Sequence, residues 1–395
     1  MSTLIGVTLA LSLAANIGQC QILVNCDLGL IDSDSIDKEF NPAHCATKSV
    51  TSATSAMKKI FLAPYPRSLA EIFHPPDLDH LRTLGELVVH EEAVVTDDVF
   101  EAHVTTADII VGQMDLPESR LKRIPQLRAI FNVEGNFLPN VDYQCCFRRG
   151  IRVLTISPVF AEPVAELALG LAIDLGRGIT RSDQDFREGT EQYGLEANRD
   201  VRSLFHQPVG FLGFGDLARA LLPLLTPFRC RVRVYDPWLP RELITEAGCE
   251  ACSLEDVLRQ SRIIFVLASA TLENKAFIGD PQFSQMQPGT IFVLLSRAAV
   301  VDFDALVRAA QVRHIRVATD VFPEEPLSQQ HSARRTRNML LSAHKGGALE
   351  RTLKRIGSVV VADTELICRG LPPVMCKIAQ PETVELFRGK PVVKS

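Results

Sequence analysis

Three ionisable side chains, Arg297, Glu325 and His344, stand at or just beyond the ends of the predicted strands TIFVLLS, RVATDVF and MLLSA. An arginine fork can bind a carboxylate and polarise the carbonyl beside it. An imidazole can donate a proton to that carbonyl oxygen as a hydride reaches the carbon, and it is the base in the reverse direction. A carboxylate that accepts the other imidazole N–H orients the ring. Each residue alone is more often a surface or packing residue, but together they predict interconversion of a 2-oxo acid and a 2-hydroxy acid.

This chemistry needs an element that brings strand ends together, and the pattern of the chain predicts one. From residue 209 onward, apolar runs alternate with amphipathic ones: VGFL, RVRVY, RIIFVLAS, TIFVLLS, RVATDVF and MLLSAH. Such alternation is typical of a parallel sheet with helices on both faces, in which the carboxyl ends of the strands face the ligand. We therefore expect the three side chains to converge at one edge of a Rossmann sheet.

The segment VGFLGFGDLARALLPLLTPFRCRVRVYD (residues 209–236) predicts the ligand. A short strand leads into a turn with the small residues of G-x-G-x-x-G/A, and the helix after it offers N–H donors to a pyrophosphate. A second strand ends at an acid 23 positions after the first glycine, where a carboxylate can accept hydrogen bonds from ribose hydroxyls and disfavours a 2′-phosphate. We predict NAD as the cofactor, in contact with Gly213, Phe214, Gly215, Asp216, Leu217, Ala218 and Asp236. A methyltransferase also places an acid after its second strand, but it has no need of the arginine, glutamate and histidine.

Composition limits the function classes. The chain has 395 residues, 23% of them charged and 46% hydrophobic, with a net charge of −5. It has no basic excess that would attract nucleic acid or an anionic membrane, so neither is expected as a partner. Ten cysteines are scattered without the second half of a zinc site, so no metal is expected, and reduced thiols fit a cytoplasmic enzyme.

The N-terminus differs from the rest. Residues 4–15 are apolar and about as long as the core of a signal peptide, but no lysine or arginine precedes them, and they are short for a membrane span. We expect residues 1–56 to be a poorly ordered extension, and MKKIFLAPYP, from Met57, to start the folded part. A misassigned start remains open at this point.

Before the glycine turn, a first βα series reads KIFLA, LVVH, DIIVG, LRAIFNV and GIRVLTI. The run AEPVAELALGLAIDLGRG (residues 161–178) is apolar nearly all round, with Pro163 suited to a first helical turn. It is predicted to be a helix that connects two domains. Whether it also forms a subunit interface or is an ordinary core helix stays open.

Several segments together identify a resemblance. ATDVFPEEPL is similar to the DVF-x-x-EP segment of the D-isomer-specific 2-hydroxyacid dehydrogenases, LLSRAAVVD to their arginine segment, and SAHKGG to their histidine segment. The resemblance implies that Arg297 binds substrate, that His344 is the acid and base with Glu325 as its partner, and that Asp320 contacts the nicotinamide carboxamide. Ser296, next to the arginine, is predicted as a further cofactor contact.

The resemblance begins near Lys59 and implies an α/β protein with two Rossmann-like, doubly wound parallel-sheet domains and a cleft between them. The expected division is residues 57–157 as the first part of the substrate domain, 158–344 as the NAD-binding domain with its connecting helix, and 345–395 returning to the substrate domain. A homodimer that uses the helix at residues 161–178 is also implied.

The substrate-binding loop departs from the family pattern. Where the family has a glycine-rich loop whose N–H groups bind the substrate carboxylate, this chain has NVEGNFLPNVD, which makes Gly135 and Asn136 the candidates. Glu134 would repel a carboxylate there unless its side chain points away. The prediction is an NAD-dependent oxidoreductase acting on a small 2-hydroxy or 2-oxo acid, of the D-isomer by resemblance. The alternative is a non-catalytic NAD(H)-binding regulatory protein of the same fold.

Overall fold

The computed structural model describes residues 58–312 and 315–386. They belong to one compact unit, residues 55–395. The predicted extension, residues 1–56, lies outside the described residues.

The first sheet has six strands in the order β13-β5-β4-β3-β1-β2. The strands β1 to β5 pair in parallel, and β13 is antiparallel to β5. The strands are β1 (Lys58–Ala63), β2 (Gly85–Val89), β3 (Ile109–Gly112), β4 (Ala129–Asn132), β5 (Arg152–Thr155) and β13 (Lys377–Ile378). Its helices are α1 (Leu69–Ile72), α2 (Pro75–Leu84), α3 (Asp97–Val99), α4 (Glu118–Leu121), α5 (Tyr143–Arg149) and α14 (Glu350–Cys368).

The second sheet has seven strands in the order β12-β11-β10-β9-β6-β7-β8, all parallel. The strands are β6 (Pro208–Leu212), β7 (Arg231–Tyr235), β8 (Glu250–Ala251), β9 (Ile263–Val266), β10 (Ile291–Leu294), β11 (Arg316–Thr319) and β12 (Met339–Leu341). The helices are α6 (Ala161–Arg177), α7 (Ile179–Glu188), α8 (Gly194–Ala197), α9 (Asp216–Leu225), α10 (Arg241–Glu246), α11 (Leu254–Gln260), α12 (Asp280–Phe283) and α13 (Phe303–Val312). The winding direction reverses between β6 and β9, and this reversal is where doubly wound sheets bind their ligands.

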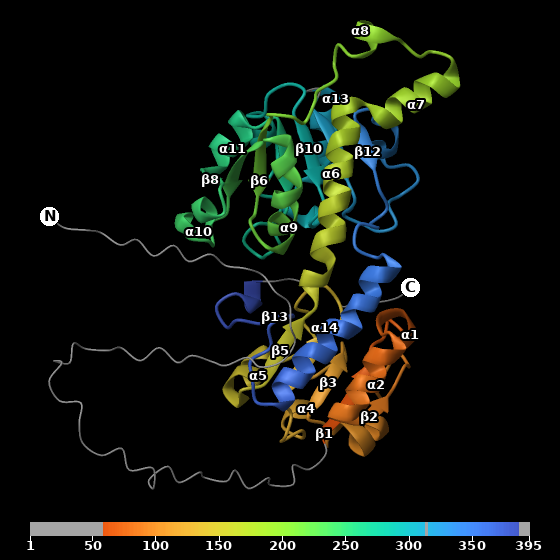
Figure 1. Ribbon diagram of the computed structural model, residues 1–395, viewed down its shortest axis with the longest axis vertical. Coiled ribbons are helices and arrows are strands. Elements are labelled where there is room, and N and C mark those ends of the chain that lie inside the picture. Colours follow the sequence, from red (N-terminus) through yellow and green to blue (C-terminus); the bar gives the residue numbers. More distant parts are fainter. Residues whose placement is uncertain (1–57, 313–314, 387–395) are drawn as a thin grey trace, which may run out of the picture. The chain divides into compact units, whose positions relative to one another are not determined.

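Apolar cores cover both faces of both sheets. The strands β3, β9 and β10 are buried along their whole length, which is why they read as unbroken apolar runs. On one face of the seven-stranded sheet, α6 and α9 pack over Phe211 and Phe265, and on the other α11 and α13 pack over Phe292. Figure 1 shows α6 running across the sheet and α14 lying over the six-stranded one. The helix α6 ends at Gly178, whose φ of 64° suits a glycine C-cap.

The two doubly wound sheets confirm the predicted fold class. Two short strands were not predicted. β8 has two residues at the sheet edge, and β13 is a two-residue antiparallel strand from the tail. Strands of this length carry no alternation that a sequence pattern could reveal.

Candidate active site

The glycine turn lies at the winding reversal, between β6 and α9. Gly213 has a φ of 96°, and a Cβ there would come within 2.7 Å of the Ala268 backbone, so only glycine fits without strain. At Gly215, the N-cap of α9, a Cβ would meet nothing within 4 Å. The turn therefore leaves open space in front of a helix N-terminus, which fits the close approach of a pyrophosphate.

The other predicted turn residues divide by burial. Ala218 and Phe214 are buried, so they shape the turn from below, and Leu217 is half-buried against the same core. Asp216 is the first residue of α9, and its carboxylate lies 3.6 Å from Lys377 Nζ.

Asp236 lies directly after β7 and holds the turn. The Phe214 N–H donates to its Oδ2 at 2.8 Å, and the Trp238 N–H donates to its Oδ1 at 2.9 Å. Each carboxylate oxygen accepts two hydrogen bonds readily, so capacity remains for ribose hydroxyls. Contact between Asp236 and the ribose stays a prediction. By accepting the Phe214 N–H, Asp236 also stabilises the glycine turn, which the sequence pattern did not indicate.

The structure brings His344 and Glu325 together. His344 Nδ1 lies 2.6 Å from Glu325 Oε2, and the second carboxylate oxygen accepts the Phe322 N–H at 3.0 Å. Among the described residues, His344 Nε2 has no hydrogen-bond partner, and 47% of the side chain is exposed. His344 adopts a φ of 47°, a conformation rare for residues other than glycine. One ring nitrogen is thus fixed and the other is available for proton exchange.

Asp320 supports the loop that carries this histidine. Its carboxylate is buried, with Oδ1 accepting the Lys345 N–H at 3.0 Å and Oδ2 accepting the Gly346 N–H at 2.9 Å. Contact between Asp320 and the nicotinamide carboxamide stays a prediction. Asp320 also fixes the histidine loop through these two hydrogen bonds. This role was not predicted, because the N–H donors lie 25 and 26 positions further along the chain.

Arg297 is exposed and directly precedes the short 3₁₀ helix at residues 298–300. Its Nη1 donates to the Ser296 carbonyl at 2.7 Å. The side chain reaches solvent, but protein atoms packed around the guanidinium desolvate it and lower the pKa of Arg297, while Glu325 and Glu134 act to raise it. The Arg297 guanidinium therefore lies within electrostatic range of Glu325, after β11, and of Glu134, after β4. The Ser296 Oγ is buried and has no partner among the described residues.

The candidate substrate loop follows β4, and its acid is already paired. Arg67 Nε lies 3.0 Å from Glu134 Oε1, and Arg67 Nη2 lies 3.5 Å from Glu134 Oε2. Arg67 therefore compensates the charge of Glu134 that was expected to repel a carboxylate. On the same loop, a Cβ added at Gly135 would come within 3.2 Å of Phe160, and one added at Gly347 would come within 3.0 Å of the same ring. Arg67 was not predicted as a site residue, although its position just beyond the first strand, in KIFLAPYPR, places it at the same sheet edge as Glu134.

The described part of the chain contains neither a membrane-spanning helix nor a metal-binding cluster. Among the described helices, none combines the length and the hydropathy of a transmembrane span. Residues 58–312 and 315–386 contain no group of three or more His, Cys, Asp or Glu side chains that could hold a metal ion.

Comparison with known proteins identifies the family. The model described as "D-isomer specific 2-hydroxyacid dehydrogenase, NAD binding domain" matches residues 169–346. A solved structure described as a phosphoglycerate oxidoreductase from Rhizobium etli is 45% identical, with a TM-score of 0.74, and the match covers 83% of this chain and 100% of that one. The chain belongs to the D-isomer specific 2-hydroxyacid dehydrogenase family.

Similar curated proteins are also dehydrogenases or reductases. The glyoxylate reductase of Aeropyrum pernix is 29% identical over 259 residues, which are 64% of this chain and 77% of that protein. The glyoxylate reductase of Thermococcus litoralis is 27% identical over 259 residues, 64% of this chain and 78% of that protein. These matches confirm the resemblance, the oxidoreductase class and NAD as the cofactor of this D-2-hydroxyacid dehydrogenase. They do not favour the non-catalytic alternative.

Proposed function

We propose that this D-2-hydroxyacid dehydrogenase reduces a small 2-oxo acid to its D-2-hydroxy acid, and catalyses the reverse oxidation, with Arg297, Glu325 and His344 as the reacting machinery. The observation that carries the proposal is the 2.6 Å contact of His344 Nδ1 with Glu325 Oε2, which leaves Nε2 available. Both residues follow strands of the sheet that also holds the glycine turn.

The proposed roles rest on the chemistry of the three side chains and on the contact between His344 and Glu325. Protonated His344 donates its Nε2 proton to the carbonyl oxygen, and Glu325 stabilises the charged ring through Nδ1–H. Arg297 binds the substrate carboxylate through its planar fork and polarises the adjacent carbonyl. In the oxidative direction, neutral His344 accepts the proton of the hydroxyl group. Asp320 fixes the backbone that carries the histidine.

The cofactor residues fit NAD. Gly213 and Gly215 leave room for the pyrophosphate at the N-terminus of α9, and Asp236 stands ready for the ribose. The bound nicotinamide supplies or accepts the hydride. Ser296 and Asp320 are the proposed residues near the nicotinamide ring, and the N–H groups of Gly135 and Asn136 are the proposed partners of the substrate carboxylate.

We also propose the domain division expected from the sequence, with residues 57–157 and 345–395 forming the substrate domain and 158–344 the NAD-binding domain. The pairing of β13 with β5 supports this division, because it joins the tail to the six-stranded sheet. A cytoplasmic location is proposed because the reaction needs a supply of NAD.

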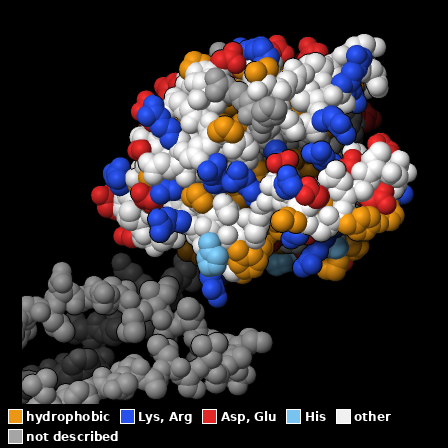
Figure 2. All heavy atoms as spheres, turned by 90° about the horizontal axis from the view of Figure 1, so that it is seen from above, with side chains coloured by type: hydrophobic (Ala, Val, Ile, Leu, Met, Phe, Trp, Pro, Cys, Tyr) orange, Lys and Arg blue, Asp and Glu red, His pale blue; other side chains and the backbone are white. Residues whose placement is uncertain are grey.

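A homodimer formed through α6, α7 and α8 is proposed as the assembly. Large apolar side chains on α7 and around α8 are exposed: Ile179 by 55%, Phe186 by 62%, Tyr193 by 74% and Leu195 by 80%. Figure 1 shows α7 and α8 projecting from the seven-stranded sheet, and Figure 2, viewed from that end, shows apolar side chains along one edge of a face with interspersed charges. Exposed apolar groups of this kind mark protein interfaces.

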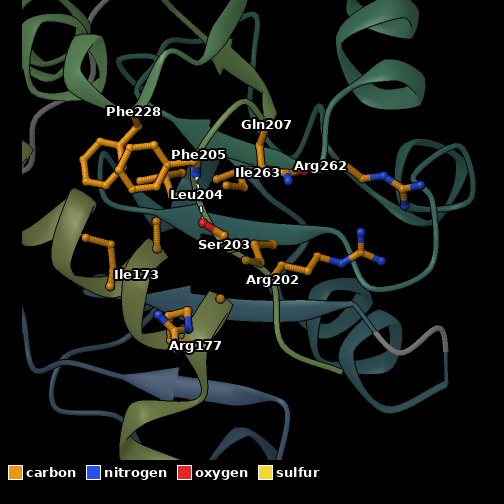
Figure 3. A pocket seen from close by; sticks show the side chains of 13 residues that line it. Ile173, Arg177, Arg202, Ser203, Leu204, Phe205, Gln207, Phe228, Arg262 and Ile263 are labelled. Atoms are coloured by element: carbon orange, nitrogen blue, oxygen red, sulfur yellow. Dashed lines mark hydrogen bonds between the residues drawn. The ribbon is translucent and has the colours of Figure 1, made fainter. Parts of the chain in front are cut away.

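A small pocket beside the end of α6 supports the same proposal. Its volume is about 90 Å³, and Figure 3 shows Phe205 and Phe228 together on one side, with Ile173 of α6 nearby and Arg202 and Arg262 pointing away from the two rings. Phe205 is 51% exposed. The apolar lining suits a hydrophobic side chain of a second copy.

Sedimentation tests the dimer. The wild-type protein is expected to sediment as a dimer at micromolar concentration, and Leu195→Glu is expected to shift it to monomer because a charge would be buried in the contact. Val94→Glu is the matched control, since Val94 is 66% exposed near the six-stranded sheet. A monomeric wild-type protein would contradict the proposal.

Cofactor oxidation tests the function. With NADH, the wild-type enzyme is expected to reduce at least one acid in a panel of glyoxylate, hydroxypyruvate, pyruvate and bulkier 2-oxo acids, and the loss of NADH absorbance measures the rate. NADPH is expected to be the poorer cofactor, because Asp236 disfavours a 2′-phosphate. Measurable NADH binding without turnover of any acid would overturn the proposal.

A further inference from the structure

An arginine outside the proposed reacting machinery lies against the candidate substrate loop. Arg67 follows β1 and Glu134 follows β4, both at the carboxyl ends of strands in the six-stranded sheet. Gly135 and Asn136, the proposed carboxylate-binding residues, come directly after Glu134. The charge on Glu134 therefore stands beside the place where an anionic substrate is proposed to bind.

The pair has two contacts and is partly buried. Arg67 presents Nε and Nη2 to the two carboxylate oxygens of Glu134, at 3.0 and 3.5 Å, and the two side chains are 25% and 15% exposed. A side-on arrangement of this kind is directional, and burial limits its screening by solvent. This distinguishes it from fully exposed ion pairs, which contribute little.

The surrounding loops hold both partners in register. Gln113, after β3, donates from Nε2 to the Tyr65 carbonyl at 3.0 Å and accepts the Val133 N–H at 3.0 Å, so it ties the loop of Arg67 to the loop of Glu134. The Thr155 hydroxyl donates to the Glu134 carbonyl at 2.7 Å. The pair is thus fixed at the level of the backbone as well as the side chains.

The electrostatic reach of Glu134 extends to the proposed substrate-binding arginine. Glu134 acts to raise the pKa of Arg297, as Glu325 does. A carboxylate close enough to stabilise the cation at Arg297 is close enough to repel an anion bound there. Compensation by a neighbouring cation removes that repulsion.

We propose that Arg67 is a specificity-determining residue of this enzyme: its guanidinium neutralises Glu134, so that the loop at Gly135 and Asn136 accepts the carboxylate of an anionic substrate. This inference rests on the proposed function. Without Arg67, the uncompensated charge of Glu134 weakens the binding of 2-oxo acids that carry a net negative charge. It favours 2-oxo acids whose side chain carries a positive charge. Arg67 thereby sets the charge of substrate that the loop admits.

A double-mutant cycle tests the proposal with the best 2-oxo acid from the panel. Arg67→Gln is expected to raise KM by about 10- to 100-fold with little change in kcat, since it exposes the Glu134 charge. Glu134→Gln alone is expected to leave KM within a few-fold of wild type, and Arg67→Gln/Glu134→Gln is expected to restore most of the lost affinity. A purely structural role of the pair would instead leave the double variant as defective as Arg67→Gln, and that result would overturn the proposal.

Two further readouts separate charge from folding. The raised KM of Arg67→Gln is expected to fall as salt is added, because ions screen the repulsion, and its activity is expected to shift toward the guanidinium-bearing 2-oxo acid derived from arginine. As a matched control, Arg308→Gln removes a more exposed pair with Asp280, whose closest atoms are 2.7 Å apart, and is expected to leave KM unchanged. An unchanged KM in Arg67→Gln would overturn this inference alone, whereas a wild-type enzyme that reduces no 2-oxo acid would overturn the proposed function with it.

Discussion

Replacing His344 with asparagine is expected to lower kcat for 2-oxo acid reduction by about 10²- to 10⁴-fold, the range lost when a general acid is removed. Asparagine is a better substitution than alanine for this test, because His344 has a φ of 47° and asparagine adopts this conformation with less strain. The amide cannot deliver a proton to the carbonyl oxygen. Steady-state assays of NADH oxidation measure the loss.

The binding of NADH gives the control for this variant. Cofactor affinity, followed by NADH fluorescence, is expected to change little, because the glycine turn and Asp236 lie on other loops of the sheet. His80→Asn, on the surface helix α2, is the matched substitution and is expected to leave kcat unchanged. A fully active His344→Asn enzyme would show that another group supplies the proton.

Replacing Arg297 with glutamine is expected to lower kcat/KM by about 10²- to 10³-fold, since each lost charge-assisted hydrogen bond costs about 1.5 to 3 kcal/mol. Glu325 and Glu134 both act to raise the pKa of this guanidinium, so the substitution removes the cation that the two carboxylates stabilise. Arg297→Lys is expected to fall between wild type and glutamine, because lysine keeps the charge but not the planar fork.

Substrate saturation curves measured for both variants decide this prediction. The larger part of the effect is expected in KM, because the arginine holds the substrate carboxylate, with a smaller part in kcat from lost polarisation. Equal kcat/KM in Arg297→Gln and the wild type would mean that the carboxylate binds elsewhere. Measuring the free energy of unfolding of each variant shows whether the fold is intact.

The sequence predicted the features that are local. The strands β3, β9 and β10 are continuous apolar runs because they are buried on both faces, and Gly213 is required because its φ is 96°. The trio could be predicted because strand ends meet at one edge of a parallel sheet. The 2.6 Å contact of His344 with Glu325 agrees with that expectation.

Features that depend on distant parts of the chain were not predictable. Arg67 and Glu134 are 67 positions apart, and only the parallel pairing of β1, β3 and β4 brings their loops together. Asp320 holds the histidine loop through backbone N–H groups, which have no signature in sequence. The hydrogen bond from Phe214 to Asp236 similarly needs the turn and the end of β7 in three dimensions.

The fate of deuterium tests whether the nicotinamide delivers a hydride to C2 of the 2-oxo acid. Reduction of the best 2-oxo acid with NADH dideuterated at C4 of the nicotinamide should place one deuterium at C2 of the D-2-hydroxy acid, as read by mass spectrometry and chiral chromatography. His344→Asn should slow this product without changing where the label goes. A product without deuterium at C2, or the L-isomer, would contradict hydride transfer by a D-specific dehydrogenase.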